Sequence, residues 1–479
     1  MKKIIISKLF LYRYRFVIGY ILLGIAFVTL LFSLPLFAQT GLSQQEMESA
    51  TASYQLEIDA PMNGDLVDLP YRVLQKFSIL LFGLTPYSIK LPSIIVGLLL
   101  GLLLILLLNR WFKSNVSLLA SCLVVLSTPF LFLAGNGTPL IMIVFWPTLL
   151  LWLGSKIQGE KRPEPIYSFL FAIVMLFSIF TPYMIYFAIF CVIFVWAQPH
   201  LRFVIKSLPR LPLSIVTAII IAGITTLILN IINQPETISE LLFSKGFVAT
   251  DFLKNLSAGL APVFLWDGSL ESVFMTPLIG LPTLALALVG LFSTTKGFFA
   301  SRNSIATLLF IFTLIIAGFN PNAILFFILP LAIIVAHGLK YLLEKWYGLF
   351  PENPYARIAA IFPLSILFVA ILLPSLLQYV YGYRYNPNVV SQFSQELATV
   401  RANLTNEKLV VDEEDRDFYK ILEISTDIRL IEEVNVEKPE KFAKLGGYAE
   451  YKYYTLERII TSPMRENSDI MYLYTVKGE

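Results

Sequence analysis

The sequence predicts a polytopic α-helical membrane protein, with about eleven transmembrane helices and a small α/β domain at its C-terminal end. Of its 479 residues, 57% are hydrophobic and 14% are charged, and the mean hydropathy is +0.72. Soluble domains carry roughly 25% charged residues, so the composition excludes an ordinary soluble protein. A second observation supports this fold class. Long polar stretches are few, and apolar runs lie between them.

Apolar segments of about the length that a membrane span requires recur along the first part of the chain. We expect spans at residues 16–37, 88–108, 117–134, 139–155, 166–181, 183–197, 212–233, 274–293, 303–319, 323–342 and 358–380. The first run has an alternative interpretation as a cleaved signal peptide, because Phe37-Ala38-Gln39 weakly resembles a processing site. Its length favours a retained span.

Basic residues predict the orientation of these spans. Lys and Arg are concentrated at the N-terminus and in the alternate loops that follow the even-numbered spans. Cytoplasmic loops carry an excess of Lys and Arg, so we expect the N-terminus inside and the C-terminal domain outside. The predicted outer loops contain fewer basic residues, namely Arg72, Lys76, Lys90, Lys245 and Lys254.

Two predicted outer loops are long, at residues 38–87 and 234–273, within a transmembrane domain that covers residues 1–381. From residue 382 the composition becomes charged and mixed. Runs such as Lys408–Asp412 and Asp469–Tyr474 predict strands between helical segments. Residues 382–479 are therefore predicted to form an extracytoplasmic α/β domain with its own modest core.

Charge and cysteine content exclude two classes of function. The net charge is only +3 and no basic patch lies in a suitable place, so we expect no nucleic-acid binding. The two cysteines, Cys122 and Cys191, both lie inside apolar runs. They are predicted to be small packed residues rather than parts of a disulfide framework or metal site.

Several short motifs follow one another around the second and third spans. They are Pro70-Tyr71, Leu81-Phe82-Gly83, Ile89-Lys90-Leu91-Pro92-Ser93 and Ser127-Thr128-Pro129-Phe130. In their order and spacing they resemble the GT-C glycosyltransferases, among them the protein mannosyltransferases and the aminoarabinose–lipid A transferases. Lys90 stands where arginine is common in that family.

This resemblance implies an enzyme that moves a sugar from a polyprenyl-phosphate donor to a protein, lipid or glycan acceptor. It also places the active side of this multi-pass protein outside, while the basic N-terminus, the short loops and the lack of an organelle signal favour the plasma (inner) membrane. Two alternatives remain open: a non-catalytic GT-C relative that binds a lipid-linked sugar, and a transporter or flippase for a lipid-linked glycan. Transporters often show internal repeats and charges at mid-membrane, and neither is evident here.

Sugar transfer requires a base for the acceptor proton and positive charge for the leaving phosphate. The resemblance places the base in the first outer loop, where Glu46 matches one residue of the family's usual acidic pair. Glu57 and Asp59 are later candidates in the same loop. Ser43 and Glu46 also fit a capping box, which would turn this carboxylate toward its own helix start.

For substrate binding, Lys245 and Lys254 are candidates for contact with the donor phosphate, because positive charge is scarce outside. Arg72 and Asp267 are further candidates, although headgroup anchoring by Arg72 and a turn at Asp267 are simpler roles. The family's second acidic site, after the third span, has no counterpart in Gly135–Pro139. No metal ligand is therefore assigned, while a divalent metal as cofactor remains possible.

Overall fold

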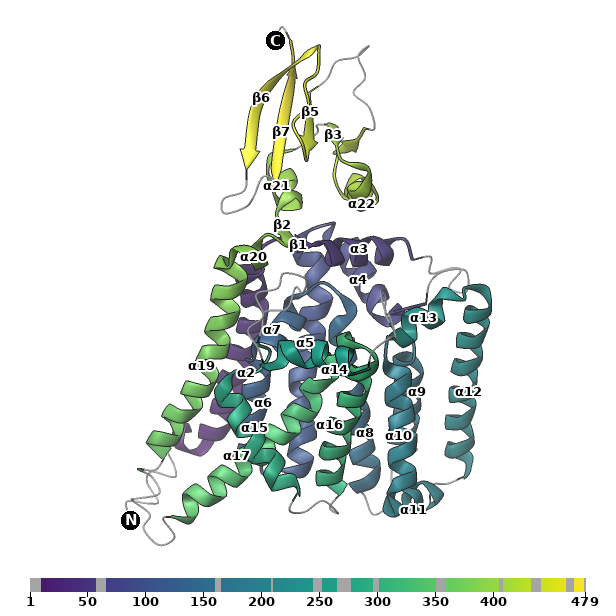
Figure 1. Cartoon of the computed structure of the whole chain (residues 1–479), viewed down its shortest axis with the longest axis vertical. Helices are drawn as coiled ribbons and strands as arrows, with labels where there is room; N and C mark the ends of the chain where they lie inside the picture. The colour runs from purple at the N-terminus through teal and green to yellow at the C-terminus, as the bar shows by residue number, and fades with distance from the viewer. Residues whose placement is uncertain are drawn as a thin grey trace.

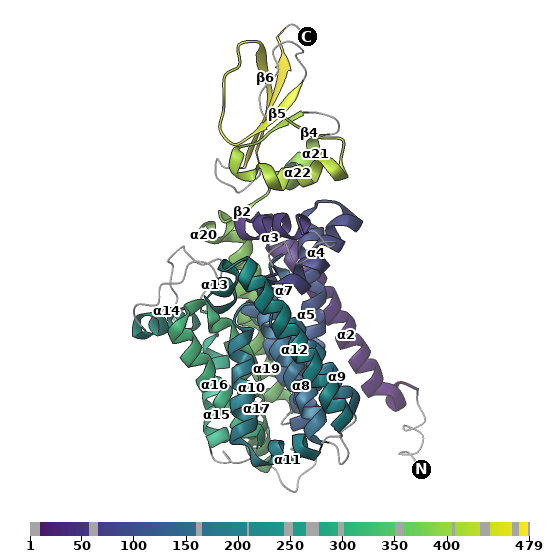
Figure 2. The ribbon, with the colours of Figure 1, turned by 90° about the vertical axis from the view of Figure 1, so that its right-hand side faces the viewer.

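The computed structural model describes residues 10–56, 66–159, 165–207, 210–243, 252–264, 277–295, 301–349, 359, 361–404, 408–431, 441–461 and 469–477. Helices dominate as far as Tyr385, and a sheet follows (Figure 1). The long helices stand side by side as a bundle, and the sheet lies beyond one end of it (Figures 1 and 2).

The bundle begins with α2 (Phe10–Ala38), which runs to the end that carries the sheet. Its other helices are α5 (Pro86–Trp111), α6 (Ser114–Val125), α7 (Thr128–Gly135), α8 (Met142–Gly159), α9 (Pro165–Ser178), α10 (Met184–Ala197), α11 (Pro199–Ser207), α12 (Arg210–Asn233), α15 (Leu281–Thr295), α16 (Ser301–Phe319), α17 (Ile328–Gly348) and α19 (Ile361–Tyr385). Short 3₁₀ helices, η1 (Pro139–Ile141) and η2 (Pro321–Phe327), precede α8 and α17.

Helices occupy every one of the predicted spans. Among the described residues, five helices are long and apolar enough to cross a membrane, and a sixth span arises if α6 and α7 are counted together. These two helices are bent by 66° at a short break. Several other apolar helices are shorter than a full crossing, so the number of spans and their orientation stay predictions.

The described parts of the two long polar stretches also contain helices. The first contains α3 (Gln44–Tyr54) and the amphipathic α4 (Leu69–Phe82), and the second contains α13 (Glu236–Phe243) and α14 (Phe252–Phe264). In both views α3 lies across the end of the bundle, between the long helices and the sheet (Figures 1 and 2).

The C-terminal part follows α19 directly through α20 (Pro387–Val390). It contains β2 (Phe393–Ser394), α21 (Glu396–Asn403), β3 (Lys408–Val410), η3 (Glu413–Asp415), α22 (Arg416–Ser425), β4 (Arg429–Leu430), β5 (Phe442–Leu445), β6 (Tyr454–Thr461) and β7 (Ile470–Val476). Five strands form one mixed sheet in the order β4-β3-β5-β7-β6. β3 pairs in parallel with β4 and β5, and β7 pairs antiparallel with β5 and β6. A sheet with helices thus lies in the region predicted to form the α/β domain, while residue 382, the predicted boundary, falls inside α19.

The C-terminal part and the first long loop share a hydrophobic core. Met47 and Ala50 of α3 are buried in one cluster with Leu397 of α21 and Phe418 of α22. A two-stranded antiparallel ladder joins β1 (Leu42–Ser43) to β2. Because burial of apolar area is the main stabilising term in folding, α3 is held between the bundle and the C-terminal part.

Close helix packing at α15 and α17 depends on glycine. A Cβ added at Gly338 would collide with the carbonyl oxygen of Leu286, and one at Gly290 would collide with that of Ile334. Small residues allow helix backbones to approach closely in membranes. We therefore expect Gly338→Ala to lower the free energy of unfolding by about 1–3 kcal/mol, because backbone atoms cannot rotate away.

Thermal unfolding of the purified protein measures this effect. Gly24→Ala in α2 is the matched control, since no atom lies within 4 Å of the added Cβ. That change is expected to leave stability unchanged or raise it by about 0.5–1 kcal/mol. Equal effects of the two substitutions would contradict the close contact.

The C-terminal part contains a half-buried acid, Glu396, with a pH-dependent contribution to stability. Burial, reinforced by the nearby charge of Asp469, raises the pKa of Glu396 to about 8. An acid whose pKa is raised by folding destabilises the folded state as it ionises. The stability that Glu396 contributes is therefore complete below its unfolded pKa, of about 4.3, and falls as the pH rises toward 8.

We expect Glu396→Gln to raise the unfolding temperature at pH 8 by several degrees and to leave it nearly unchanged at pH 5, about one unit above the unfolded value. Differential scanning of the full chain at both pH values measures this. Glu450→Gln, an exposed carboxylate in the same part of the chain, is the control. The prediction fails if both variants follow the pH profile of the wild type.

Candidate functional site

The site begins where the first long loop leaves α2. Ser43 is the N-cap of α3, and its hydroxyl accepts a hydrogen bond from the backbone N–H of Glu46. In return, Oε2 of Glu46 accepts from the backbone N–H of Ser43 at 2.8 Å. This is the capping box that the sequence predicts, and it satisfies two N–H groups that a helix start otherwise leaves unpaired.

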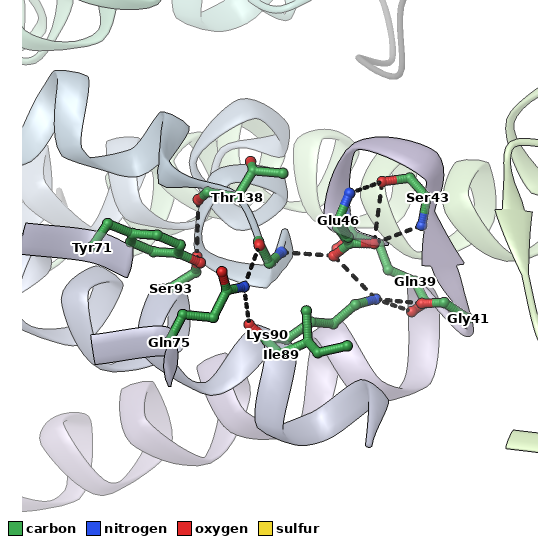
Figure 3. A network of polar contacts seen from close by, with 11 residues as sticks. Gln39, Gly41, Ser43, Glu46, Tyr71, Gln75, Ile89, Lys90, Ser93 and Thr138 are labelled. Atoms are coloured by element: carbon green, nitrogen blue, oxygen red, sulfur yellow. Dashed lines mark hydrogen bonds and ion pairs between the residues drawn. The ribbon is translucent and has the colours of Figure 1, made fainter. Parts of the chain in front are cut away.

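The other carboxylate oxygen of Glu46 faces the bundle (Figure 3). Oε1 accepts from the backbone N–H of Gly137 at 2.6 Å, in the turn between α7 and η1. It also lies 3.8 Å from Nζ of Lys90. Glu46 is 0% exposed and Lys90 is 1% exposed, so this is a buried ion pair that joins the loop to the bundle.

Lys90 lies near the start of α5, on an otherwise apolar helix. Its ammonium donates to the backbone carbonyls of Gln39 (2.7 Å) and Gly41 (2.8 Å). The ring of Phe393 in β2 lies 5.7 Å from Nζ. One buried cation therefore connects the end of α2, the start of the first loop and the C-terminal strand β2.

A second row of hydrogen bonds, from residues of α4, lies beside this pair (Figure 3). The side-chain amide of Gln75 donates to the carbonyls of Ile89 and Gly137, and its oxygen accepts from Ser49 and Ser53 of α3. The hydroxyl of Tyr71 lies 2.7 Å from that of Ser93. Burial, more than the nearby charge of Glu46, raises the pKa of Tyr71 far above its ordinary value, so this hydroxyl stays neutral.

Other polar side chains around the pair have no hydrogen-bond partner among the described residues. Four side chains are buried with polar atoms that lack such a partner: the amides of Gln39 and Asn136, and the hydroxyls of Thr138 and Tyr379. Each unpaired buried polar group costs about 1–3 kcal/mol. Such a group is therefore a site at which a water or a polar ligand is stabilised.

These four side chains come from segments that lie near the Glu46–Lys90 pair. Asn136 and Thr138 flank Gly137, which binds Glu46, and a Cβ on Gly135 would lie 2.7 Å from Oε1 of Gln39. Tyr379 is within electrostatic range of Glu46. Ring contacts continue from Tyr379 to Tyr383 at 5.1 Å and from Tyr383 to Phe393 at 6.2 Å. We call this group, with Glu46 and Lys90, the polar centre.

The structure places only some of the predicted site residues. Glu46 is in the polar centre; Arg72 is half-buried on α4, and Lys254 is exposed on α14. Glu57, Asp59, Lys245 and Asp267 lie outside the described residues. Within the described ranges, no group of three or more His, Cys, Asp and Glu side chains could hold a metal ion.

The sequence-based assignment of site residues missed Lys90, Asn136, Thr138 and Tyr379. A signal for Lys90 was present, because a lysine inside a predicted span is a functional candidate by default. No comparable signal marks Tyr379, which is one of 23 tyrosines. Its position becomes special only when α19 packs beside α2 and α7.

No protein-family model matches the sequence, and no curated protein matches it either. Solved structures do match. ArnT from Cupriavidus metallidurans in the apo state is 12% identical, with a TM-score of 0.52 over 90% of this chain and 93% of that chain. The same protein bound to undecaprenyl phosphate gives a TM-score of 0.51 over 96% and 98%, at 11% identity.

The oligosaccharyltransferase of Archaeoglobus fulgidus, tethered with an acceptor peptide, is also similar. It is 10% identical, with a TM-score of 0.51 over 85% of this chain but only 63% of that chain. At such low identity these likenesses show the fold alone. The chain has the GT-C fold, as the motifs in the sequence predicted.

Proposed function

We propose that this chain is a membrane glycosyltransferase, which transfers a sugar from a polyprenyl-phosphate donor to an acceptor on the extracytoplasmic side. Its fold is shared with ArnT, a structure of which contains undecaprenyl phosphate. The observation that carries the proposal is the polar centre. Its unpaired amides and hydroxyls are buried at the end of an apolar bundle, where a sugar or phosphate would supply the hydrogen bonds that they lack.

Within this proposal, Glu46 and Lys90 hold the first loop in place. Both oxygens of Glu46 accept hydrogen bonds, and Lys90 donates to two carbonyls. These contacts support a positioning role for the pair. They leave Glu46 without the free oxygen that a general base needs, although opening of the capping box would release Oε2.

The base then comes from Asp59 or Glu57. Their segment starts directly after Leu56, whose carbonyl accepts a hydrogen bond from Lys76 of α4 at 2.5 Å. This bond fixes the chain a few residues before Asp59, at the same end of the bundle as α3. We propose Lys254, Lys245, Arg72 and Asp267 as substrate contacts and assign no metal ligand.

One observation favours a second candidate, a non-catalytic relative that binds the lipid-linked sugar. Glu46 is fully enclosed, and the turn Gly135–Pro139 offers no carboxylate. Such a protein would bind the donor at the polar centre without transfer. Binding and transfer must therefore be measured separately.

Tyr379→Phe tests whether the polar centre binds the donor. The phenol has no hydrogen-bond partner among the described residues, so its removal is expected to leave the unfolding temperature unchanged or slightly raised. If the hydroxyl binds the donor phosphate or sugar, the Kd rises about ten-fold, as for a hydrogen bond to a charged group. Binding of a labelled polyprenyl-phosphate sugar to the purified protein measures it.

The matched control is Ser121→Ala on α6, which also removes a buried hydroxyl that lacks a partner among the described residues. It should leave the Kd unchanged. A Tyr379→Phe protein with the wild-type Kd would remove the polar centre as the donor site. A lowered unfolding temperature in the same variant would instead reveal a structural hydroxyl.

A further inference from the structure

A cavity lies at the end of the bundle opposite the sheet. Its volume is about 260 Å³, and α5, α8, α9, α10, α11, α12 and α16 all contribute to its walls. Both views place α11 at this far end of the bundle (Figures 1 and 2). The cavity is therefore remote from the polar centre, and the proposed function does not use it.

The walls of this cavity are suited to a hydrocarbon chain. Phe171, Phe194 and Ile220 are typical of the lining, which is almost wholly apolar. Gly154 also lines it, and a Cβ there would meet nothing closer than 4.0 Å, so this glycine leaves room. An empty apolar cavity lacks the dispersion contacts that a bound chain would provide.

Two serines lie within these walls, and the hydroxyl of one of them, Ser155, donates to the carbonyl of Trp152. The hydroxyl of Ser168 is buried and has no hydrogen-bond partner among the described residues. A hydroxyl in that state can donate to an ester carbonyl of a ligand. A plain hydrocarbon would leave it unpaired.

Two basic residues lie next to the cavity wall in α11. Leu201 and Ile205 of α11 line the cavity, while Arg202 and Lys206, next to them in the helix, are exposed. A short helix with an apolar face and a basic face is typical of the membrane interface, where it attracts anionic lipids. Leu201 and Ile205 thus form part of the cavity wall, and the basic side chains beside them are at the level expected for lipid headgroups.

We propose that this cavity binds one acyl chain of an anionic glycerophospholipid, with the lipid phosphate at Arg202 and Lys206 and an ester carbonyl at Ser168. The lipid would come from the leaflet on the α11 side. The orientation predicted from the basic residues makes that the cytoplasmic leaflet, which is rich in anionic lipids. This site is independent of the proposed transfer reaction.

Photo-crosslinking tests the proposal. The full chain is reconstituted into phosphatidylcholine nanodiscs with a trace of phosphatidylglycerol that carries a diazirine near the end of one acyl chain. After irradiation, mass spectrometry is expected to locate the label on cavity residues such as Phe171, Cys191 and Ile220. A phosphatidylcholine probe with the same acyl chain should label them at least about five-fold less.

Two kinds of variant separate this site from ordinary lipid contact. Gly154→Leu, which fills the cavity, should abolish the label on these residues, and Ile220→Phe serves as a second filler if the first misfolds. Arg202→Gln and Lys206→Gln should each reduce it about five-fold, whereas Lys113→Gln, an exposed lysine that follows α5, should not. Equal labelling by both probes, or labelling that Gly154→Leu and Ile220→Phe leave unchanged, would overturn the proposal. The proposal would also be overturned if polyprenyl phosphate, and no anionic glycerophospholipid, competed with the label, because the cavity would then bind the donor chain.

Discussion

Glu46→Gln is expected to lower the free energy of unfolding by about 3–5 kcal/mol, because it leaves the ammonium of Lys90 buried without its counter-charge. The new amide also brings an N–H group toward the backbone donors of Ser43 or Gly137, both of which now point at a carboxylate oxygen. The loss should appear as a lower unfolding temperature for the purified protein and as easier proteolysis in the first loop.

A matched ion pair on the surface provides the control. Lys340 and Glu344 lie 3.8 Å apart, the same separation as Lys90 and Glu46, but their side chains are 37% and 62% exposed. Glu344→Gln should cost less than about 1 kcal/mol. If the two glutamine variants lose equal stability, the buried pair does not hold the loop.

A double-mutant cycle sharpens this result. Lys90→Met alone leaves Glu46 buried and charged, so it should also be strongly destabilising. The double variant Glu46→Gln/Lys90→Met removes both charges and should recover part of the loss. Effects of the two substitutions that simply add would show that the residues do not interact.

Asp59→Asn is expected to reduce sugar transfer by about 10²–10⁴-fold, which is the usual contribution of a general base. Replacing the carboxylate by an amide removes the proton acceptor but keeps the size of the side chain. Donor binding and the unfolding temperature should therefore stay at wild-type values. Transfer from a labelled polyprenyl-phosphate sugar in membranes gives the rate, and binding to purified protein gives the Kd.

Glu57→Gln is the control within the same segment. If Asp59 is the base, Glu57→Gln keeps transfer within a few-fold of the wild type. The opposite pattern would assign the role to Glu57. Full activity in both variants would exclude this segment as the source of the base and leave Glu46, released from its capping box, as the candidate.

The fold was largely predictable because its main signal is local. Among the described residues, each apolar run in the sequence contains helix, and the capping box at Ser43 and Glu46 forms as the spacing predicts. The order of the motifs from Pro70 to Phe130 predicted the GT-C fold, and the structural likeness to ArnT confirms it. The count of membrane crossings remains a prediction, because several helices are too short to decide it by length.

The polar centre was less predictable because it is assembled from distant segments. Asn136 precedes the glycine that binds Glu46, and nothing in its local sequence indicates that its amide is buried. Tyr379 comes from the last long helix, and Phe393 reaches Lys90 only through the pairing of β1 with β2. Periodicity describes which face of a helix is buried; it does not identify the partner across the interface.

The most direct test of the central claim is a paired measurement on the wild-type protein in membranes: binding of a labelled polyprenyl-phosphate sugar, and release of the sugar to an acceptor. The proposed function predicts both, with binding weakened by Tyr379→Phe and transfer strongly reduced by Asp59→Asn. Binding without transfer would contradict the enzyme and support the non-catalytic relative. No binding at all would contradict both and return a transporter of lipid-linked glycans to consideration.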